Sequence, residues 1–177
     1  IDYVTIATTG DSMTFGSLSD VRWFAGNTRA STTRLLFIGG ATPTNLDIIE
    51  FIEIPTLGDS QDFGELSGTL KGYGMGCGNC QSSTRTVTMG GWDGSSDRND
   101  IHYLTFATKG DSIDFGDLLA TTRGGGSNSN KTRGILAGGR TPTQVNTIQF
   151  ITFSTTGDAT NFGDLTSIRA FNCAGMS

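Results

Sequence analysis

The 177-residue chain has few charged side chains and no cluster of basic ones. Charged residues make up 16% of the sequence, and the net charge is −5. Nucleic acids and anionic membranes are both bound through clustered Lys and Arg, so we expect no nucleic-acid partner. No apolar run approaches the roughly 20 residues of a membrane-spanning helix, and we expect no membrane insertion.

Cysteine and histidine are also scarce, which limits metal and redox chemistry. The three cysteines, Cys77, Cys80 and Cys173, are an odd number and make a poor disulfide framework. Cys77 and Cys80 form one C-x-x-C pair, whereas a zinc site needs a second pair or histidines. The chain has a single histidine, His102. The composition therefore predicts no metal and no cofactor, and small buried thiols.

Glycine, in contrast, is abundant, with 26 residues, and it marks an internal repeat. The stretch GDSMTFGSL at 10–18 returns as GDSQDFGEL at 58–66, GDSIDFGDL at 110–118 and GDATNFGDL at 157–165. One repeat thus spans about 48–52 residues, a length typical of propeller blades. Every copy carries a Phe followed by Gly, and these are Phe15, Phe63, Phe115 and Phe162.

Two further segments recur in the same register. TRLLFIGG, TRTVTMGG and TRGILAGG end in the glycine pairs Gly39-Gly40, Gly90-Gly91 and Gly138-Gly139. IDYVTIAT, IEFIEIPT, IHYLTFAT and IQFITFST precede each Gly-Asp and carry large apolar groups at both odd and even positions. Both faces of this segment are expected to be covered, as in a sheet packed between two others. Its polar second position, which includes His102, is expected to face solvent.

These segments read as strands, because they are short, rich in β-branched and aromatic residues, and bounded by turn residues. For the second copy we predict strands at 71–78, 84–91, 101–108 and 113–118. Four antiparallel strands per repeat indicate an all-β fold of β-propeller blades. The landmarks cover the chain, so we expect one repeat domain over residues 1–177.

The order of these strands resembles the kelch repeat. A strand ending in a Gly pair precedes an aromatic-bearing strand and a short aromatic-x-x-Leu strand. Kelch repeats usually have Trp where this chain has Phe, and often Arg at the start of the next blade, a position that Arg22, Arg123 and Arg169 match and Lys71 does not. The phrases DYVTIATTGDSMTFGSL and STTRLLFIGG also resemble tandem repeats of phage tail-fibre and related structural proteins.

The strand count predicts an incomplete propeller. There are four copies of the aromatic and Phe-Gly strands, but only three of the TRxxxxGG strand. We expect the chain to be part of a longer protein. Two alternatives are a four-bladed ring with a defective closing blade, and a ring or fibre assembled from several chains.

The sequence offers few groups for catalysis. Some kelch-like propellers are copper oxidases, but these need several histidines and this chain has only His102. A Ser-His-Asp set would likewise need another histidine. The Asp residues after Gly recur with the repeat, so they favour a role in turns. Gly124–Gly126 lacks the following Lys-Ser/Thr of a phosphate-binding loop. We predict that the protein is not an enzyme.

One segment departs from the repeat. Where the other copies have ATPTNLDI and RTPTQVNT, the second has WDGSSDRND at 92–100. Such departures are where function is grafted onto a scaffold. Trp92 could stack on a sugar with Asp93, Arg98 and Asn99 as polar partners, or the ring could simply cap the core. Asp93, Asp97 and Asp100 lack the spacing of a calcium-binding loop.

These observations favour a non-enzymatic virion component of a phage, either a tail fibre or a decoration protein. It would contact other virion proteins, copies of itself or a host-surface glycan. The alternative is a cellular kelch-type propeller that binds proteins or glycans. A third hypothesis is a hydrolase or lyase whose catalytic residues lie outside this chain.

Overall fold

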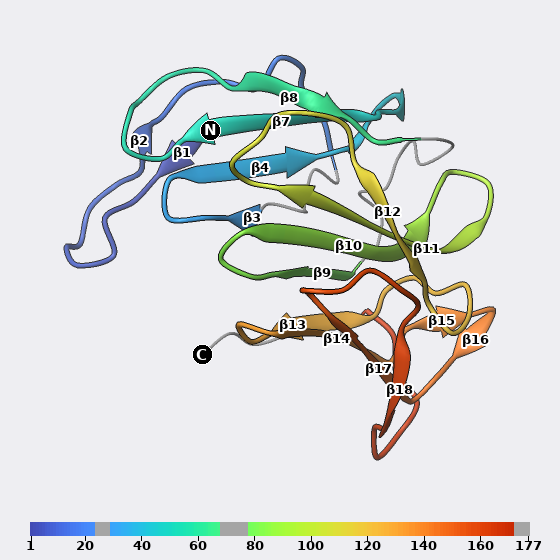
Figure 1. The fold of residues 1–177 in the computed structure, drawn as a ribbon. Helices are drawn as coiled ribbons and strands as arrows, with labels where there is room; N and C mark the ends of the chain where they lie inside the picture. The colour runs from blue at the N-terminus through green and yellow to red at the C-terminus, as the bar shows by residue number, and fades with distance from the viewer. Residues whose placement is uncertain (24–28, 68–77, 172–177) are drawn as a thin grey trace.

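The structure, a computed structural model, describes residues 1–23, 29–67 and 78–171. This part of the chain is all-β, with no helix, and its strands form antiparallel sheets of four or two strands (Figure 1). The all-β prediction is confirmed. Because the described residues contain no helix, none of them forms a long apolar helix that would cross a membrane.

The three four-stranded sheets share one topology, in which neighbouring strands follow chain order as an antiparallel meander. The first sheet consists of β3 (Arg29–Ala30), β4 (Arg34–Ile38), β7 (Ile48–Glu53) and β8 (Gln61–Glu65). The second consists of β9 (Gly78–Gln81), β10 (Arg85–Trp92), β11 (Asp97–Thr105) and β12 (Ile113–Asp117). The third consists of β13 (Gly126–Ser129), β14 (Arg133–Ala137), β17 (Thr147–Thr152) and β18 (Thr160–Asp164).

Three two-stranded sheets complete the described part. The N-terminal hairpin pairs β1 (Asp2–Tyr3) with β2 (Met13–Thr14). Small hairpins connect the second and third strands of the first and third sheets: β5 (Ala41–Thr42) with β6 (Thr44–Asn45), and β15 (Arg140–Thr141) with β16 (Thr143–Gln144). In the second sheet β10 and β11 extend into this position instead.

The strands predicted for the second copy agree with the structure in three of four cases. The predictions at 84–91 and 113–118 correspond to β10 and β12 within a residue. The strand predicted at 101–108 overlaps β11, which begins earlier, at Asp97, and ends at Thr105. The prediction at 71–78 falls almost wholly outside the described residues, and β9 starts at its last residue.

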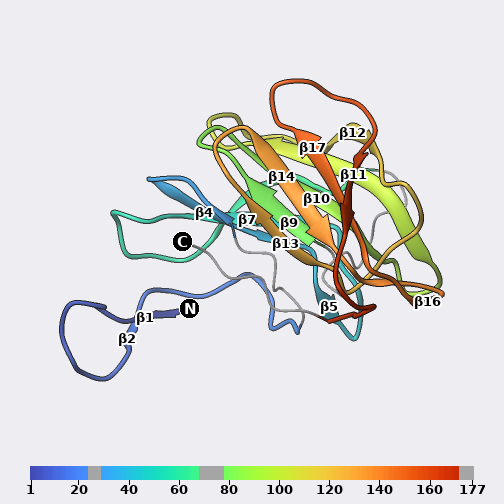
Figure 2. The same cartoon turned by 90° about the horizontal axis from the view of Figure 1, so that it is seen from below.

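The four-stranded sheets are stacked with their first strands side by side (Figures 1 and 2). Ser127 Oγ in β13 donates to the Asn79 carbonyl in β9 at 2.8 Å, and the Asn79 amide donates back to Ser127 Oγ. The Ala30 amide in β3 donates to Gln81 Oε1 in β9 at 3.1 Å. These bonds link the first strands of all three sheets.

The core consists of two apolar layers, one between each pair of neighbouring sheets. The first layer joins the faces of the first and second sheets through Leu36, Ile38, Ile49, Phe51, Phe63, Leu66, Leu104 and Phe106. The second joins the second and third sheets through Cys80, Val87, Met89, Ile101, Phe115, Leu118, Leu136, Ile151, Phe153 and Ala159. The second sheet thus buries both faces, as its sequence predicts. The Cys80 thiol lies in this layer, and Cys77 and Cys173 lie outside the described residues.

The expectation that the polar position beside each aromatic faces solvent is wrong for three of its four copies. Glu50, His102 and Gln149 are all buried, with His102 7% exposed, and only Asp2 is exposed. Glu50 Oε1 accepts the Ser19 amide at 3.0 Å, and Gln149 Oε1 accepts the Leu119 amide at 3.0 Å. These side chains are buried because they satisfy backbone groups of the connection from the preceding repeat unit.

Candidate functional site

Each Phe-Gly pair of a four-stranded sheet forms a β-bulge in the fourth strand. In the first sheet Ile49 pairs with Gly64 and Glu50 with Asp62, so Phe63 is the extra residue. The second and third sheets have the same register shift at Phe115 and Phe162. A bulge re-aims the side chain of the extra residue. Phe63 thereby reaches the layer between sheets and packs edge-to-face on Phe51, with ring centroids 5.8 Å apart.

The Gly-Asp motif of each sheet docks on the Phe-Gly motif of the preceding unit. Between the first and second sheets the Gly110 amide donates to the Phe63 carbonyl at 2.8 Å, and the Ser112 amide donates to the Glu65 carbonyl at 2.9 Å. The Asp111 carboxylate accepts the Glu65 amide at 2.9 Å. We call this three-bond arrangement the junction.

The same junction occurs three times. The N-terminal hairpin and the first sheet form it between 15–17 and 58–60, with Asp59 accepting the Ser17 amide at 2.8 Å. The second and third sheets form it between 115–117 and 157–159, with Asp158 accepting the Asp117 amide at 3.0 Å. The recurring Asp is therefore a structural acceptor that connects neighbouring units.

The glycine after each docked Phe is required by this close approach. A Cβ added to Gly64 would lie 2.4 Å from the Gly110 carbonyl oxygen, and one on Gly16 would lie 2.0 Å from that of Gly58. Gly64 also has φ of +152°, a backbone conformation that residues with a Cβ rarely adopt. The glycine pairs after β4, β10 and β14 likewise have positive φ at both residues: Gly39, Gly40, Gly90, Gly91, Gly138 and Gly139.

The Arg of TRxxxxGG makes a further bond between sheets. The Arg34 guanidinium lies 4.9 Å from the Phe51 ring centroid, and its Nη1 donates to the Phe106 carbonyl of the second sheet at 2.9 Å. The Arg85 guanidinium lies 4.6 Å from the Tyr103 centroid and donates to the Phe153 carbonyl of the third sheet at 3.0 Å. Each Arg thus combines a cation–π contact with a carbonyl of the next sheet.

The non-repeating loop at 92–100 is a tight hairpin at the end of β10 and β11. Trp92 pairs with Asp97, and Gly91 pairs with Arg98. The Asp93 carboxylate closes the turn, because it accepts the amides of Ser95 and Ser96 at 2.8 Å each. Burial raises the pKa of Asp93, but these bonds and the nearby Arg98 outweigh it and hold the pKa below its usual value.

Arginines hold the side chains of this loop. The Arg123 guanidinium lies 5.7 Å from the Trp92 ring centroid, and its Nε is 3.1 Å from Asp97 Oδ1. Arg98 lies between two carboxylates, with Nη1 3.5 Å from Asp93 and Nε 2.8 Å from Asp100. Trp92 is half-buried. The loop is therefore a preformed hairpin with a tryptophan at its base.

The four candidate ligand-binding residues come together only in part. The hairpin brings Trp92, Asp93 and Arg98 to one site, where the two charged groups bond to each other and to the turn. Asn99 follows in β11, and its carbonyl accepts the Leu118 amide at 2.7 Å. The three loop carboxylates each face an arginine, and the described residues contain no group of three or more His, Cys, Asp or Glu side chains suited to a metal.

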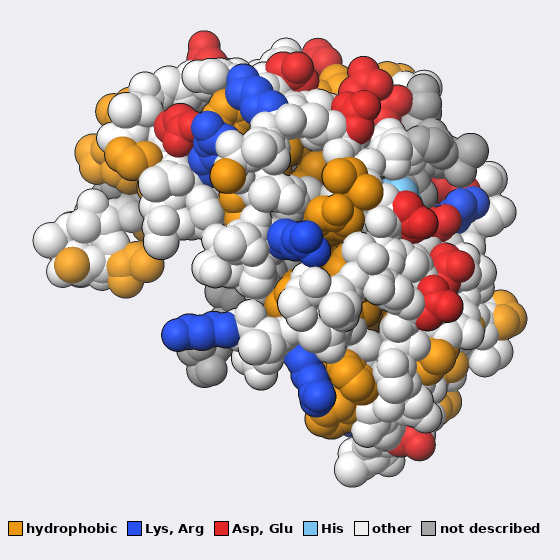
Figure 3. Space-filling view, in the orientation of Figure 1, with side chains coloured by type: hydrophobic (Ala, Val, Ile, Leu, Met, Phe, Trp, Pro, Cys, Tyr) orange, Lys and Arg blue, Asp and Glu red, His pale blue; other side chains and the backbone are white. Residues whose placement is uncertain are grey.

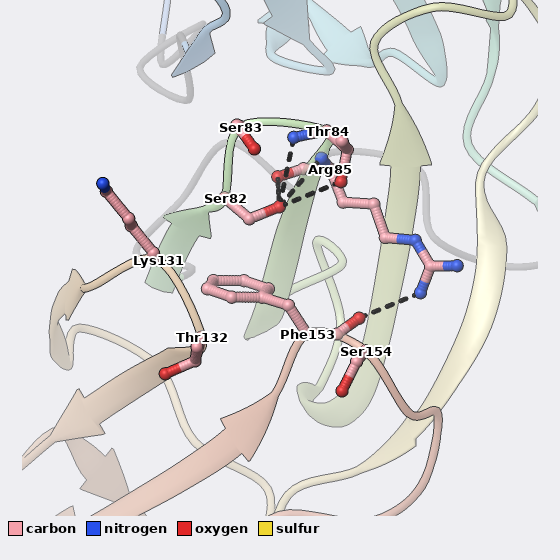
Figure 4. Close-up of a pocket in the computed structure, with 8 residues that line it drawn as sticks. All are labelled: Ser82, Ser83, Thr84, Arg85, Lys131, Thr132, Phe153 and Ser154. Atoms are coloured by element: carbon pink, nitrogen blue, oxygen red, sulfur yellow. Dashed lines mark hydrogen bonds between the residues drawn. The ribbon is translucent and has the colours of Figure 1, made fainter.

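A second candidate surface consists of the turns between the first and second strands, which the sequence reasoning missed. Ser31, Ser82 and Asn130 cap these turns, each accepting the amide of the Arg three residues later, at 2.9, 3.1 and 2.7 Å. A pocket of about 290 Å³ lies between the turns of the second and third sheets (Figure 4). Its lining combines hydroxyls such as Ser82 with the Phe153 ring and Lys131. The recurring S/N-x-T-R phrase is the signal that marks it.

No family model matches the sequence of this chain. No curated protein matches it either.

Proposed function

We propose that the chain is a non-enzymatic structural and receptor-binding component of a phage virion, in which a kelch-like β-propeller displays loops. The observation that carries the scaffold part of this proposal is the junction, which joins neighbouring units three times with the same three bonds. A side chain that recurs in every unit and hydrogen-bonds to backbone groups of a neighbouring unit has a structural role. The recurring Asp and Arg residues are therefore assigned to holding the sheets together.

The arrangement of the sheets supports the propeller assignment. Four-stranded antiparallel meanders with adjacent first strands and packed faces are the units of a β-propeller. The strand order and the spacing of the repeat agree with kelch-like blades. The fourth strands carry the bulges and junctions, so neighbouring units are joined at these strands as well as through their packed faces.

The loop at 92–100 is the part of this scaffold assigned to binding. It replaces a two-stranded hairpin of the other units. Asp93 holds its backbone, and Arg98 pairs with the carboxylates of Asp93 and Asp100. A ligand that binds a preformed loop loses little conformational entropy to ordering it. A half-buried indole beside arginine and carboxylate groups suits a sugar ring with polar substituents, so a host-surface glycan is the ligand class we assign.

The loop assignment is tested with Trp92→Ala against an array of bacterial surface polysaccharides. We expect at least about tenfold weaker binding, because an aromatic anchor is removed, with little change in the melting temperature. Trp23→Ala is the matched control, since Trp23 is also part-exposed but lies outside the loop. Equal binding by wild type and Trp92→Ala would contradict the assignment.

The virion assignment is tested by mass spectrometry of purified particles of the phage that encodes the chain. Peptides of this protein in stoichiometric amounts are expected. Their absence from particles, together with capture of the protein by a cellular partner, would favour a cellular propeller. Cleavage of a bound polysaccharide would contradict the non-enzymatic part.

A further inference from the structure

The turns between the first and second strands form a pocket at each boundary between the four-stranded sheets. The first pocket, of about 520 Å³, lies between the first and second sheets, and the second pocket, of about 290 Å³, lies between the second and third. Corresponding positions line both: the turns of the two sheets and the residues that follow the third strand of the later sheet. Both walls of each pocket belong to described sheets, away from the two ends of the stack.

The two pockets differ in charge. In the first pocket Arg34 Nε lies 2.7 Å from Glu53 Oε1, so the lining holds one positive and one negative charge. Arg34 pairs with Glu53 across neighbouring strands, whereas Arg85, in the same register, pairs with Thr105. The described lining of the second pocket contains Arg85 and Lys131 and no acidic residue. The second pocket is therefore cationic although the whole chain has a net charge of −5.

Both cations of the second pocket keep hydrogen-bond donors for a ligand. Arg85 stacks on Tyr103 and donates from Nη1 to the Phe153 carbonyl at 3.0 Å, and no carboxylate of the described residues pairs with it. Lys131 is exposed, and its ammonium group makes no ion pair within the described part of the chain. The two side chains lie on either side of the Phe153 ring (Figure 4). A ligand in this pocket thus meets positive charge from two directions.

The surrounding surface has few negative charges that would oppose an anionic ligand. Figure 3 shows Lys and Arg side chains on the left of the molecule, where the turns between the first and second strands lie in Figure 1. Most of the Asp and Glu side chains in that view lie along the top and the right. The separation of charge favours approach of an anion to the side that carries the second pocket.

The rest of the lining suits a sugar. Ser83 and Ser154 are exposed and present hydroxyl groups, while Phe153, only 5% exposed, provides an apolar floor. Hydroxyl groups around an apolar surface match a sugar ring, which has polar substituents at its rim and C–H groups on its faces. A volume of about 290 Å³ is near the lower end of the range for small-molecule sites, which suits one sugar unit.

We propose that the second pocket binds an anionic sugar unit, namely a uronic acid residue of an acidic polysaccharide. The guanidinium of Arg85 binds the carboxylate, since its planar fork matches that group. Lys131 contributes a second positive charge from the other side of the pocket. The sugar hydroxyls bond to Ser83 and Ser154, and the ring lies over Phe153.

This site is separate from the loop at 92–100. The turn at Ser82 precedes β10 and the loop follows it, so the eight residues of the strand place the two sites roughly 25 Å apart. The inference extends the proposed glycan binding to a second site with a defined ligand charge. It stands whether or not Trp92 binds a sugar.

Isothermal titration calorimetry tests the ligand class with an oligosaccharide that contains glucuronate and with its carboxyl-reduced, neutral counterpart. We expect the acidic oligosaccharide to bind at least about tenfold more tightly, because only it bonds to the two cations. Added NaCl should weaken its binding, since part of the attraction is between exposed charges. Equal affinity for the two oligosaccharides would overturn the proposal, as would the absence of binding.

Two substitutions convert the second pocket to the charges of the first. Lys131→Ser installs the residue that the second sheet has at this position. Thr105→Glu installs the counterpart of Glu53, which would pair with Arg85 as Glu53 pairs with Arg34. Each should weaken binding of the acidic oligosaccharide by at least about fivefold, with melting temperatures confirming that the variants fold.

The matched control is Lys109→Ser, which removes an exposed positive charge outside the second pocket and should bind like wild type. Trp92→Ala should also bind the acidic oligosaccharide like wild type. If Trp92→Ala lost binding while Lys131→Ser kept it, the present inference would be overturned and the loop assignment would stand. Displacement of the oligosaccharide by an equal concentration of inorganic phosphate would mean that the pocket accepts any anion, which would overturn the assignment of a sugar.

Discussion

Phe63 and Phe162 occupy the same position of the same motif in the first and third sheets, yet one is a core residue and the other lies at the surface. Both are the extra residue of a bulge, and both pack edge-to-face on an aromatic of the adjoining strand. They differ in what lies beyond. Phe63 is covered by the second sheet, whereas none of the described sheets covers Phe162. The motif therefore encodes the local bend, and the neighbouring unit provides the burial.

Truncating the two phenylalanines gives the largest expected difference. Phe63→Ala should lower the free energy of unfolding by roughly 3–5 kcal/mol, because it opens a cavity in a packed layer. Phe162→Ala should cost under about 1 kcal/mol, since its ring is largely exposed. Urea denaturation of both variants measures the difference, and similar losses would show that the exposed and buried copies are equivalent.

The glycines of the bulges test the close approach of backbones. Gly116→Ala and Gly163→Ala carry nearly the same conformational strain, with φ of +143° and +146°. Only at Gly116 would the new Cβ strike the following unit, 2.5 Å from the Gly157 carbonyl carbon. We expect Gly116→Ala to be less stable than Gly163→Ala by about 1–3 kcal/mol. Thermal melting compares them, and equal melting temperatures would argue against steric contact at the junction.

Substituting the recurring aspartates makes the same comparison, with a smaller expected change in the free energy of unfolding. Asp111→Ala removes the acceptor of the Glu65 amide and should cost about 0.5–1.5 kcal/mol. Asp11→Ala removes the corresponding side chain of the N-terminal hairpin, which is exposed. It should be nearly neutral, as judged by chemical denaturation. A comparable loss at Asp11 would mean that the side chain acts within its own unit.

The smallest expected effect concerns pH. Burial lowers the pKa of His102, and the charges of Asp114 and Asp100 oppose this only partly. The unfolded chain therefore takes up a proton at this residue first, as pH falls below about 6.5, and the folded state loses stability until pH passes below the folded pKa.

His102→Gln provides the control for this titration. Glutamine occupies the same position in the third sheet, where it is buried and hydrogen-bonded. The variant should lose less stability than wild type between pH 7 and pH 5, measured as the shift in melting temperature. An identical pH dependence of both proteins would place the His102 titration outside the folding equilibrium.

The repeat made most of the strand layout predictable from sequence. The Gly pairs and the β-branched segments located β10, β11 and β12 because turn residues and strand periodicity are local properties. Burial of Glu50 and His102 was not predictable in the same way. Their partners come from Ser19 and Ser67 in the connections that precede their sheets, and a polar residue in a strand reads as solvent-facing until those partners are known.

The candidate site was accessible to sequence reasoning only as a departure from the repeat. That departure correctly marked the hairpin at 92–100 as a distinct element. It could not show that Arg123, from the connection after β12, lies over Trp92 and pairs with Asp97. The turns around Ser82 and Lys131 were missed because they repeat in every sheet, and the pocket between them exists only once the sheets are stacked.

Residue-resolved amide hydrogen exchange, measured by NMR, tests the junction most directly. The amides of Gly58, Gly110 and Gly157 donate to the preceding unit at 3.0, 2.8 and 2.6 Å. We predict that these three are protected and exchange together, whereas the Gly10 amide of the same motif exchanges rapidly. Equal exchange rates at all four glycines would contradict the account.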